Sequence, residues 1–345
     1  MAKVTLKDVA RQAGVHVSTV SRALDPQKSQ LVGDSTRARV RAAAVELGYQ
    51  GDAIASGLRR GRTNTFAIVV ADLGNPFIAP VLRGIENGLG GRGVMPLVAE
   101  TQDDSERMEQ VMHAVLGRRV DAVITTAARH GDEQLLRRIA RQVPLVLAVR
   151  HLPDSGLSAI VHDDERGGRL AAEHLVSAGH RRIAQLCGPV NVSSFQERTA
   201  GFRSYLELRS IVSLEPPERA AFPTLQEGQR LMSRLLDSLH EPPTAVFAHN
   251  DLMAFGALDV LKERGLSCPE DVAVMGYNDT QMTRYTAPPL TTIRLPGYEL
   301  GRLAADAATM LIEAGGGATP KLTLPPVLVP RASTMDWSGS ARRPD

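Results

Sequence analysis

Apolar residues near the start of the chain recur with the period of an α-helix. Four of them lie at positions i, i+3, i+4 and i+7, namely Leu6, Val9, Ala10 and Ala13. This spacing predicts a helix with one apolar face. Thr5 and Asp8 predict a capping box where the helix begins. Gly14 predicts its end, because glycine enters the left-handed conformation without steric cost.

A second short helix is predicted directly after Gly14, with Val20 and Leu24 turned inward. Its opposite face carries Val17, Ser18, Ser21 and Arg22. Two short helices joined by a glycine turn, the second with small polar and basic residues outward, are typical of a helix-turn-helix.

A third helix is expected after these two. Its inward residues are Val40, Ala43, Ala44 and Leu47, and its solvent-facing arginines are Arg37, Arg39 and Arg41. The alternative is a small helical subdomain that binds nothing.

The charge distribution favours a nucleic-acid partner for this segment. Residues 1–63 contain eleven Lys and Arg against five Asp and Glu, a formal charge of +6, whereas the whole chain carries +2. A basic N-terminal module on a mildly acidic body is the electrostatic pattern of a DNA-binding protein with a second function.

Beyond residue 63, short β-branched runs alternate with amphipathic stretches. The runs lie at 66–70, 95–99, 120–124, 145–149, 183–187, 245–249 and 272–275. The helical stretches include 104–116, 165–178, 226–239 and 252–264. This order predicts parallel sheets covered on both faces. About 280 residues are too many for one ordinary sheet, so we expect two α/β subdomains.

Ligands of such folds bind beyond the carboxyl ends of the strands. The side chains that follow the predicted strands are Asp72, Asn75, Phe77, Thr125, Arg150, Asn250, Asp251, Asn278 and Asp279. We therefore expect a binding site among them.

Composition narrows the class of protein further. Two cysteines, Cys187 and Cys268, are too few and too far apart for a disulfide framework or a zinc site. The N-terminus has no apolar leader, and no apolar run is long enough to span a membrane. We therefore expect a cytoplasmic protein with no membrane partner.

Several longer motifs point to one family. The N-terminal Val-Thr-Leu-Lys-Asp-Val-Ala is followed by Ala-Gly-Val and Thr-Val-Ser-Arg, and further motifs lie at 75–77, 120–124, 179–183, 198–202, 250–256, 269–272 and 290–293. With these motifs the chain resembles the lactose/galactose-repressor (LacI/GalR) family of bacterial transcription regulators along almost its whole length. The resemblance implies a homodimer that binds a palindromic operator and responds to a small effector in an interdomain cleft.

The resemblance also implies the domain plan. We expect an α/β fold with an N-terminal helix-turn-helix headpiece and two Rossmann-like parallel-sheet subdomains of periplasmic-binding-protein type I. The expected segments are a headpiece at 1–48, a hinge helix or linker at 49–63, a core at 64–335 and a disordered tail at 336–345. Within the core, the N-subdomain spans about 64–162 and 294–323, and the C-subdomain about 163–293 and 324–335. The tail has no leucine heptads, so assembly beyond a dimer is not expected.

The residues of the hinge segment at 49–63 by themselves also predict a short helix. Asp52 is able to cap a helix at 53–58, which is too short to be stable alone and contains Gly57, at a cost of about 1 kcal/mol relative to alanine. Such a segment would fold on pairing with its twin on DNA. Leu58 matches the family's leucine wedge, which enters the minor groove. A plain flexible linker is the alternative.

Site residues follow from the resemblance, position by position. The expected DNA-binding residues are Thr5, Val17, Ser18, Thr19, Ser21, Arg22, Ala55 and Leu58. The expected effector-binding residues are Phe77, Ser194, Arg198, Phe222, Asn250 and Asn278. No catalytic residue, metal or cofactor is expected.

The chain departs from the family pattern at five positions. His16 stands where a Ser or Thr usually caps the recognition helix, Gly51 replaces a proline, and Gly57 replaces a longer polar residue. Val149 and Asn278 each stand where an aspartate is usual. The last two changes remove carboxylates that would accept hydrogen bonds from sugar hydroxyls. A sugar or related compound remains the expected effector.

Other motifs have simpler explanations. The G-x-G-x-x-G spacing at 88–93 follows a helical stretch, the reverse of a dinucleotide site, so it predicts a helix C-terminal turn. His174 and His180 lack a third metal ligand, and the acidic residues at 163–165 open a helix. Two other functions stay open as alternatives: an exported solute receptor, which the headpiece disfavours, and an enzyme, for which no catalytic constellation is found.

Overall fold

The computed structural model describes residues 4–25, 28–49, 62–315, 317 and 321–334. The chain divides into two compact units, residues 1–63 and 64–345. Several predicted features lie outside the described residues: the hinge helix at 53–58 with Ala55, Gly57 and Leu58, Gly51 and Asp52 before it, and the tail at 336–345.

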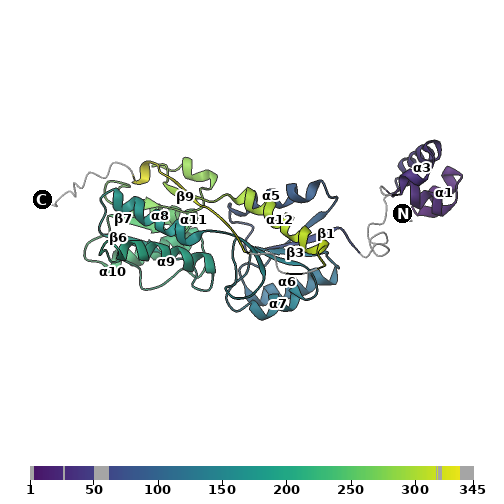
Figure 1. Ribbon diagram of the computed structural model, residues 1–345. Helices are drawn as coiled ribbons and strands as arrows, with labels where there is room; N and C mark the ends of the chain where they lie inside the picture. Colours follow the sequence, from purple (N-terminus) through teal and green to yellow (C-terminus); the bar gives the residue numbers. More distant parts are fainter. Residues whose placement is uncertain (1–3, 26–27, 50–61, 316, 318–320, 335–345) are drawn as a thin grey trace. The chain divides into compact units, whose positions relative to one another are not determined.

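Helices are the only regular secondary structure among the described residues of the first unit. It contains α1 (Leu6–Ala13), α2 (Val17–Ala23), the 3-10 turn η1 (Ser29–Leu31) and α3 (Asp34–Glu46) (Figure 1). Val9, Val20 and Val40, one from each α-helix, are completely buried against one another in a single core cluster. The three predicted helices and their apolar faces are confirmed.

The predicted ends of α1 are also confirmed. Asp8 and Thr5 form a capping box, in which Asp8 Oδ2 accepts hydrogen bonds from the backbone N (3.0 Å) and Oγ1 (2.6 Å) of Thr5. These hydrogen bonds favour the carboxylate and hold the pKa of Asp8 below its usual value. Gly14 ends the helix in the left-handed conformation, with φ of 61°.

The second unit begins with a six-stranded parallel sheet in the order β10-β5-β4-β3-β1-β2. Its strands are β1 (Thr65–Val70), β2 (Met95–Glu100), β3 (Ala122–Thr125), β4 (Leu145–Ala148), β5 (Ser158–His162) and β10 (Leu322–Leu324). Its helices are α5 (Ile78–Gly90), α6 (Ser105–Gly117), α7 (Glu133–Ala140) and α12 (Gly297–Glu313). We call this part the N-subdomain.

The sequence of strand β1 is almost entirely apolar because both faces of the strand are buried. Phe66, Ile68 and Val70 pack in the layer with α5 and α12, whereas Ala67 and Val69 pack in the layer with α6 and α7. Figure 1 shows these two helix pairs on opposite sides of β1 and β3. A strand buried on both faces has no position left for a polar side chain.

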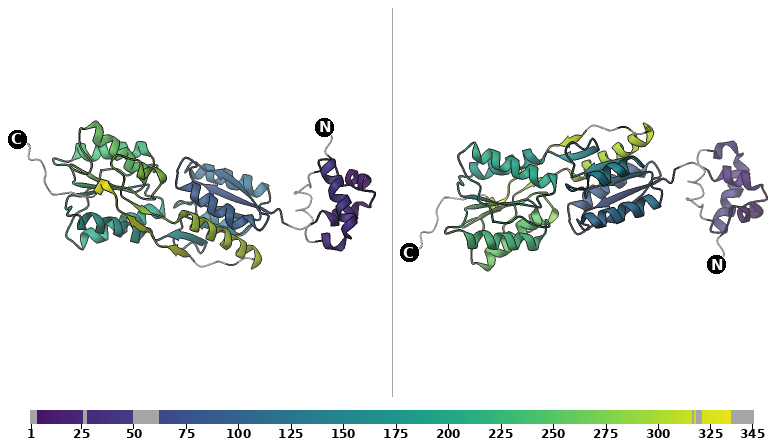
Figure 2. Two further views of the ribbon diagram at one scale, coloured as in Figure 1. Left: turned by 90° about the horizontal axis from the view of Figure 1, so that it is seen from above. Right: turned by 90° about the horizontal axis from the view of Figure 1, so that it is seen from below.

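The C-subdomain is built on a second parallel sheet, in the order β6-β7-β8. Its strands are β6 (Ile183–Leu186), β7 (Ala245–Ala248) and β8 (Ala273–Met275), and its helices are α8 (Asp164–Ser177), α9 (Ser193–Glu207), α10 (Leu225–Ser238) and α11 (Asp251–Glu263). An antiparallel pair, β9 (Thr292–Arg294) and β11 (Val327–Val329), adjoins it. Short 3-10 turns form η2 (Gln281–Arg284) and η3 (Ala332–Thr334). Figure 2 shows helices on both sides of each sheet.

The chain passes between the two subdomains three times. The crossings join β5 to α8, β9 to α12 and β10 to β11, each by a segment of one or two residues. Three short connections between two subdomains are typical of a hinge.

Glycines allow the helices to pack closely. A Cβ on Gly88 of α5 would lie 2.8 Å from the Cβ of Ala305 on α12. Gly168 of α8 and Gly201 of α9 likewise leave no room for a side chain between those helices.

Helix α5 ends at Gly90. The prediction that 88–93 forms a helix C-terminal turn is therefore confirmed.

The alternation of strands and helices is confirmed, and several elements were not predicted. The seven predicted strands are present, with ends shifted by no more than two residues. Strand β5, the β9–β11 segments and helices α7, α9 and α12 were missed. Helix α9 buries Ser193, Ser194 and Arg198 beside its apolar residues, so polar positions interrupt the apolar pattern of its sequence. None of the described helices is long and apolar enough to span a membrane.

Candidate functional site

The first candidate surface is the outer face of α2 in the helical unit. Ser18 and Arg22 are exposed, as is Thr5 at the start of α1. Thr19 and Ser21 are half-buried. Val17 is also half-buried and packs against the headpiece core, so it is less outward than predicted.

His16 caps α2 in place of a hydroxyl residue. Its ring nitrogen Nδ1 accepts a hydrogen bond from the backbone N of Ser18 at 3.2 Å and lies 2.8 Å from Ser18 Oγ. One otherwise unpaired amide at the helix start is thereby satisfied.

One of the three arginines predicted to face solvent from α3 is engaged within the headpiece. Arg37 is half-buried, donates a hydrogen bond to the carbonyl of Ser29 at 3.0 Å and pairs with Asp34. The prediction was wrong for Arg37 because η1 folds back over this part of α3. Arg39 and Arg41 are exposed, as predicted.

The second candidate site is a cleft between the subdomains, where the carboxyl ends of strands from both sheets meet. It is lined by Ala71, Asp72, Asn75, Phe77, Ile78, Asp103, Thr126, Val149, Arg150, Ser194, Phe195, Arg198, Pro223, Asn250 and Asn278. Its cavity volume is about 40 Å³. A drug-sized ligand needs a cavity several times larger, so the cleft must open to admit one.

Arg198 lies at the C-subdomain side of the cleft and is almost completely buried. Its Nε donates to Asp164 Oδ1 at 2.8 Å, and Nη1 donates to the carbonyl of His249 at 2.5 Å. The guanidinium lies 3.8 Å from the ring centroid of Tyr277, whose hydroxyl donates to the same Asp164 oxygen at 2.8 Å. Arg198 is therefore held in one orientation before any ligand arrives.

A second buried ion pair lies on the N-subdomain side. Arg150 Nη1 and Nη2 donate to the two carboxylate oxygens of Asp103 at 2.6 and 3.0 Å. Burial alone would raise the pKa of Asp103, but the charge and hydrogen bonds of Arg150 outweigh it and hold this pKa below the usual value. Both cleft arginines are thus paired with carboxylates, so neither presents an unpaired positive charge to a ligand.

The two asparagines of the cleft differ in what they offer a ligand. Asn250 caps α11: its Oδ1 accepts from Met253 N at 2.7 Å, and its Nδ2 donates to the Pro223 carbonyl at 2.7 Å. Asn278 has a φ of 117°, and its side-chain amide makes no hydrogen bond within the described part of the chain. Asn278 is therefore available to a ligand, whereas Asn250 mainly shapes the wall.

Comparison with known proteins identifies the family. The N-terminal residues 5–52 match the model of bacterial regulatory proteins, lacI family, and residues 172–334 match the periplasmic binding protein-like domain. The chain is 33% identical to the ribose operon repressor of Escherichia coli (strain K12) over 332 residues, 95% of this chain and 99% of that protein. The chain belongs to the lacI family of bacterial regulatory proteins.

Solved structures of family members agree over nearly the full length. The Lac repressor dimer bound to operator and the anti-inducer ONPF has a TM-score of 0.87 and 30% identity, covering 97% of this chain and 100% of that one. The transcriptional regulator CelR–cellobiose complex has a TM-score of 0.73 and 32% identity, covering 96% and 100%. This lacI-family protein is a DNA-binding transcriptional regulator with a ligand-binding domain.

Five of the six predicted effector residues line the cleft of this lacI-family protein. They are Phe77, Ser194, Arg198, Asn250 and Asn278. Phe222 does not line it: the side chain is 46% exposed. Its neighbour Pro223 lines the cleft and accepts a hydrogen bond from Asn250 through its carbonyl.

Sequence reasoning missed some cleft residues. Asp103 follows β2 and completes the Arg150 pair, but it falls inside a polar run, Gln102 to Asp104, with nothing to single it out. Thr126 lies in the wall, and its buried Oγ1 has no hydrogen-bond partner among the described residues. Thr126 follows β3 directly, so the rule that ligands bind after strand ends would have found it, whereas Asp103 lies three residues beyond β2.

The acidic and histidine motifs weighed in the sequence have structural roles. Asp163 caps α8 by accepting from Arg166 N at 3.0 Å, and Asp164 forms the buried pair with Arg198. His174 and His180 contact Thr334 Oγ1 (2.7 Å) and Thr244 Oγ1 (3.0 Å). Within the described residues, no three His, Cys, Asp or Glu side chains are placed to hold a metal.

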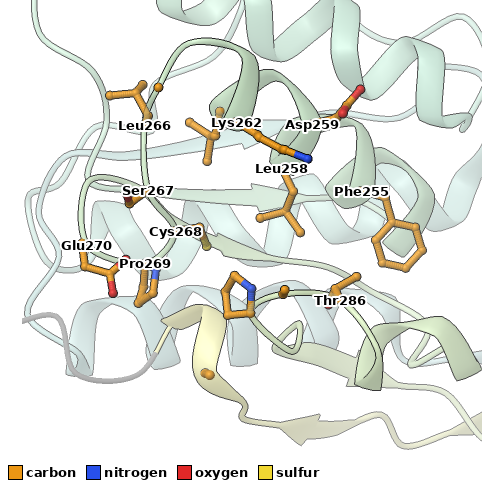
Figure 3. A pocket seen from close by; sticks show the side chains of 15 residues that line it. Phe255, Leu258, Asp259, Lys262, Leu266, Ser267, Cys268, Pro269, Glu270 and Thr286 are labelled. Atoms are coloured by element: carbon orange, nitrogen blue, oxygen red, sulfur yellow. The ribbon is translucent and has the colours of Figure 1, made fainter.

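A larger groove of about 1040 Å³ lies on the C-subdomain, away from the cleft. Figure 3 shows it between α11, with Phe255, Leu258 and Lys262, and the loop that carries Cys268 and Pro269. The rim at residues 286–288 follows η2 directly. The groove has none of the converging buried polar groups of the cleft.

Proposed function

We propose that this regulator represses transcription as a homodimer on a palindromic operator, and that a small uncharged metabolite, a sugar or related compound, controls it from the cleft. The observation that carries the proposal is the presence, in one chain, of a basic helix-turn-helix unit and a cleft with two pre-positioned, neutralised arginines. The Lac repressor dimer bound to operator and the CelR–cellobiose complex, both similar to this chain, support it.

On the DNA side, α2 would enter the major groove with Ser18 and Arg22 nearest the bases. Arginine pairs bidentately with guanine O6 and N7. Thr5, Val17, Thr19 and Ser21 would flank them, and Ala55 and Leu58 would act from the hinge.

On the effector side, the ligand would contact Phe77, Ser194, Arg198 and Asn278, with Asn250 shaping the wall. Aromatic rings of Phe77 and Phe195 offer flat apolar faces, while the free amide of Asn278 and the unpartnered Thr126 hydroxyl offer polar contacts to hydroxyl groups. We assign Phe222 to the cleft mouth instead of the site. The ligand would be bound and not converted.

The dimer face would involve both subdomains. In the N-subdomain, the edge strand β2 exposes Met95 and Val98, and an edge strand with exposed apolar side chains favours pairing. In the C-subdomain, Met282 and Tyr285 are exposed, and they come just before Thr286, which lines the groove in Figure 3. We place the domain boundaries at residues 48 and 63, with the core divided at the three crossings. A cytoplasmic location follows from action on bacterial DNA.

The deciding experiment uses the full chain. A binding site is selected from a randomised duplex library, and binding is followed by fluorescence anisotropy with and without metabolites that raise the melting temperature of the protein. We expect salt-dependent binding to a palindrome and an effect of at least one metabolite on it. Equal affinity for the selected and a scrambled duplex would refute the proposal.

A further inference from the structure

His16 does more than cap its helix, because the same nitrogen also contacts the side chain of Ser18. Nδ1 accepts from the backbone N of Ser18 at 3.2 Å and lies 2.8 Å from Ser18 Oγ. A backbone N–H donates only, so Nδ1 bears a lone pair and no proton. In the neutral ring the proton is therefore on Nε2.

This tautomer decides the direction of the hydrogen bond to Ser18. Because Nδ1 has no hydrogen to donate, the Ser18 hydroxyl is the donor across the 2.8 Å contact, and it shares the single lone pair of Nδ1 with the Ser18 amide. A serine hydroxyl has one hydrogen and two lone pairs. Once its hydrogen is directed at His16, Ser18 has only acceptor capacity left for another partner.

A serine in the major groove ordinarily reads either donors or acceptors. In this headpiece the hydrogen bond to His16 removes that choice for Ser18. We propose that His16 is a specificity-determining positioning residue: it makes Ser18 an obligate acceptor, which reads an exocyclic amino group, N6 of adenine or N4 of cytosine, and rejects guanine O6 and thymine O4. This inference rests on the proposed entry of α2 into the major groove, and it adds to that proposal one base preference per half-site.

The contact is local to the headpiece, and both residues are exposed. The direction of the Ser18 hydroxyl thus depends on residue 16 and on no buried group. Asparagine in place of His16 would retain a side-chain acceptor for the Ser18 amide and hydroxyl, since asparagine is also a good N-cap residue. Alanine would remove the acceptor and free the hydroxyl. These two variants form a matched pair.

The test starts from the site selected by the full chain from randomised duplexes at pH 8. Each adenine of a half-site is replaced in turn by purine, and each cytosine by 2-pyrimidinone, so that only the amino group is lost. At one position we expect the wild-type protein to lose affinity roughly 3- to 10-fold, as for one neutral hydrogen bond. Ser18→Ala should show no loss there, and this identifies the position that Ser18 reads.

The two His16 variants then separate positioning from simple capping. His16→Asn should keep the 3- to 10-fold loss at that position. His16→Ala should reduce it to less than about 2-fold, and should also bind guanine or thymine there nearly as well as the amino-bearing base. Because each number is a ratio of two duplexes on one protein, a general weakening of His16→Ala through a less stable α2 cancels out.

The outcomes distinguish this inference from the proposed function. If no duplex is enriched, the proposed DNA binding itself fails. If a palindrome is enriched but the Ser18-dependent position favours guanine or thymine, or if His16→Ala keeps the amino preference, the role of His16 is refuted while the regulator function stands.

Discussion

The ring nitrogen Nε2 of His151 lies 2.6 Å from Oε1 of Glu197, so the loop after β4 in the N-subdomain touches α9 of the C-subdomain. Lys321 Nζ lies 3.8 Å from the same Glu197 oxygen, and the His151 backbone N donates to Ser193 Oγ at 3.1 Å. Neither His151 nor Glu197 lines the cleft. These contacts connect the two subdomains beside the site and hold the cleft closed without touching a ligand.

The first prediction tests this closure. Glu197→Ala should increase the open fraction of the core, because it removes the acceptor that His151 contacts across the cleft. We expect amide exchange of residues 148–153, which include the His151 N–H, to become roughly 3- to 10-fold faster, corresponding to loss of about 1 kcal/mol. Hydrogen–deuterium exchange mass spectrometry measures this. Glu207→Ala, an exposed change on the same helix, serves as the control, and an equal increase in both variants would contradict the role of Glu197.

The second prediction concerns the buried pair of Arg198 and Asp164. Arg198→Ala leaves Asp164 as an uncompensated buried carboxyl, so the free energy of unfolding should fall by about 3–5 kcal/mol. Adding Asp164→Asn should recover part of this loss, since a neutral amide costs less to bury. Urea unfolding measures both, and response to the effector should be absent in both. A single variant as stable as wild type, or an intact effector response, would show that Arg198 is not the anchor of the cleft.

The third prediction concerns Asp251, the buried first residue of α11. Burial raises its pKa to about 7, although hydrogen bonds from Thr280 and Thr292 oppose the shift. Between about pH 4 and 7 the folded state therefore holds a proton on Asp251 that the unfolded state has lost, so this residue lowers stability as the pH rises. Buried His162 and His180, whose pKa values are lowered to about 3 and about 4 by burial, act in the opposite sense below pH 6.5.

The measurement is therefore a difference between two pH profiles. Asp251→Asn does not ionise, so its unfolding free energy should rise more steeply with pH between 4 and 7 than that of wild type, by up to about 1.4 kcal/mol per pH unit. Above pH 7 the two profiles should run parallel. Parallel profiles over the whole range would mean that Asp251 ionises normally in the folded protein.

The fourth prediction concerns self-association. Tyr285 is 72% exposed and Met95 67% exposed, on different subdomains. Charged substitutions at the proposed dimer face, Val98→Glu or Tyr285→Glu, should raise the dimer dissociation constant at least 10-fold, because a charge would be desolvated in an apolar contact. Sedimentation velocity measures the effect. Val212→Glu, also at an exposed apolar position, is the control, and dimers unaffected by all three changes would place the interface elsewhere.

Much of the architecture depends on patterns among neighbouring residues, and the sequence alone determined that part. The spacing of Val9, Ala10 and Ala13 determines one face of α1, and the β-branched run of β1 predicts a strand buried on both sides. Helix and strand periods are properties of neighbouring residues, so they can be recognised without the fold. The general location of the cleft followed as well, since polar residues after parallel strands gather at one edge.

Only the tertiary structure decided which charged side chains of the cleft pair with each other. Asp103 and Arg150 are 47 positions apart, and Asp164 and Arg198 are 34 apart, yet the paired side-chain atoms lie 2.6 to 3.0 Å apart in the buried interior. No sequence period links such residues; they meet because strand order and helix packing bring separate segments together. The same holds for Phe222, which is exposed outside the cleft although its neighbour Pro223 lines it. Contacts between distant residues depend on the whole chain having folded, and this is why the sequence predicted the position of the cleft but not its ion pairs.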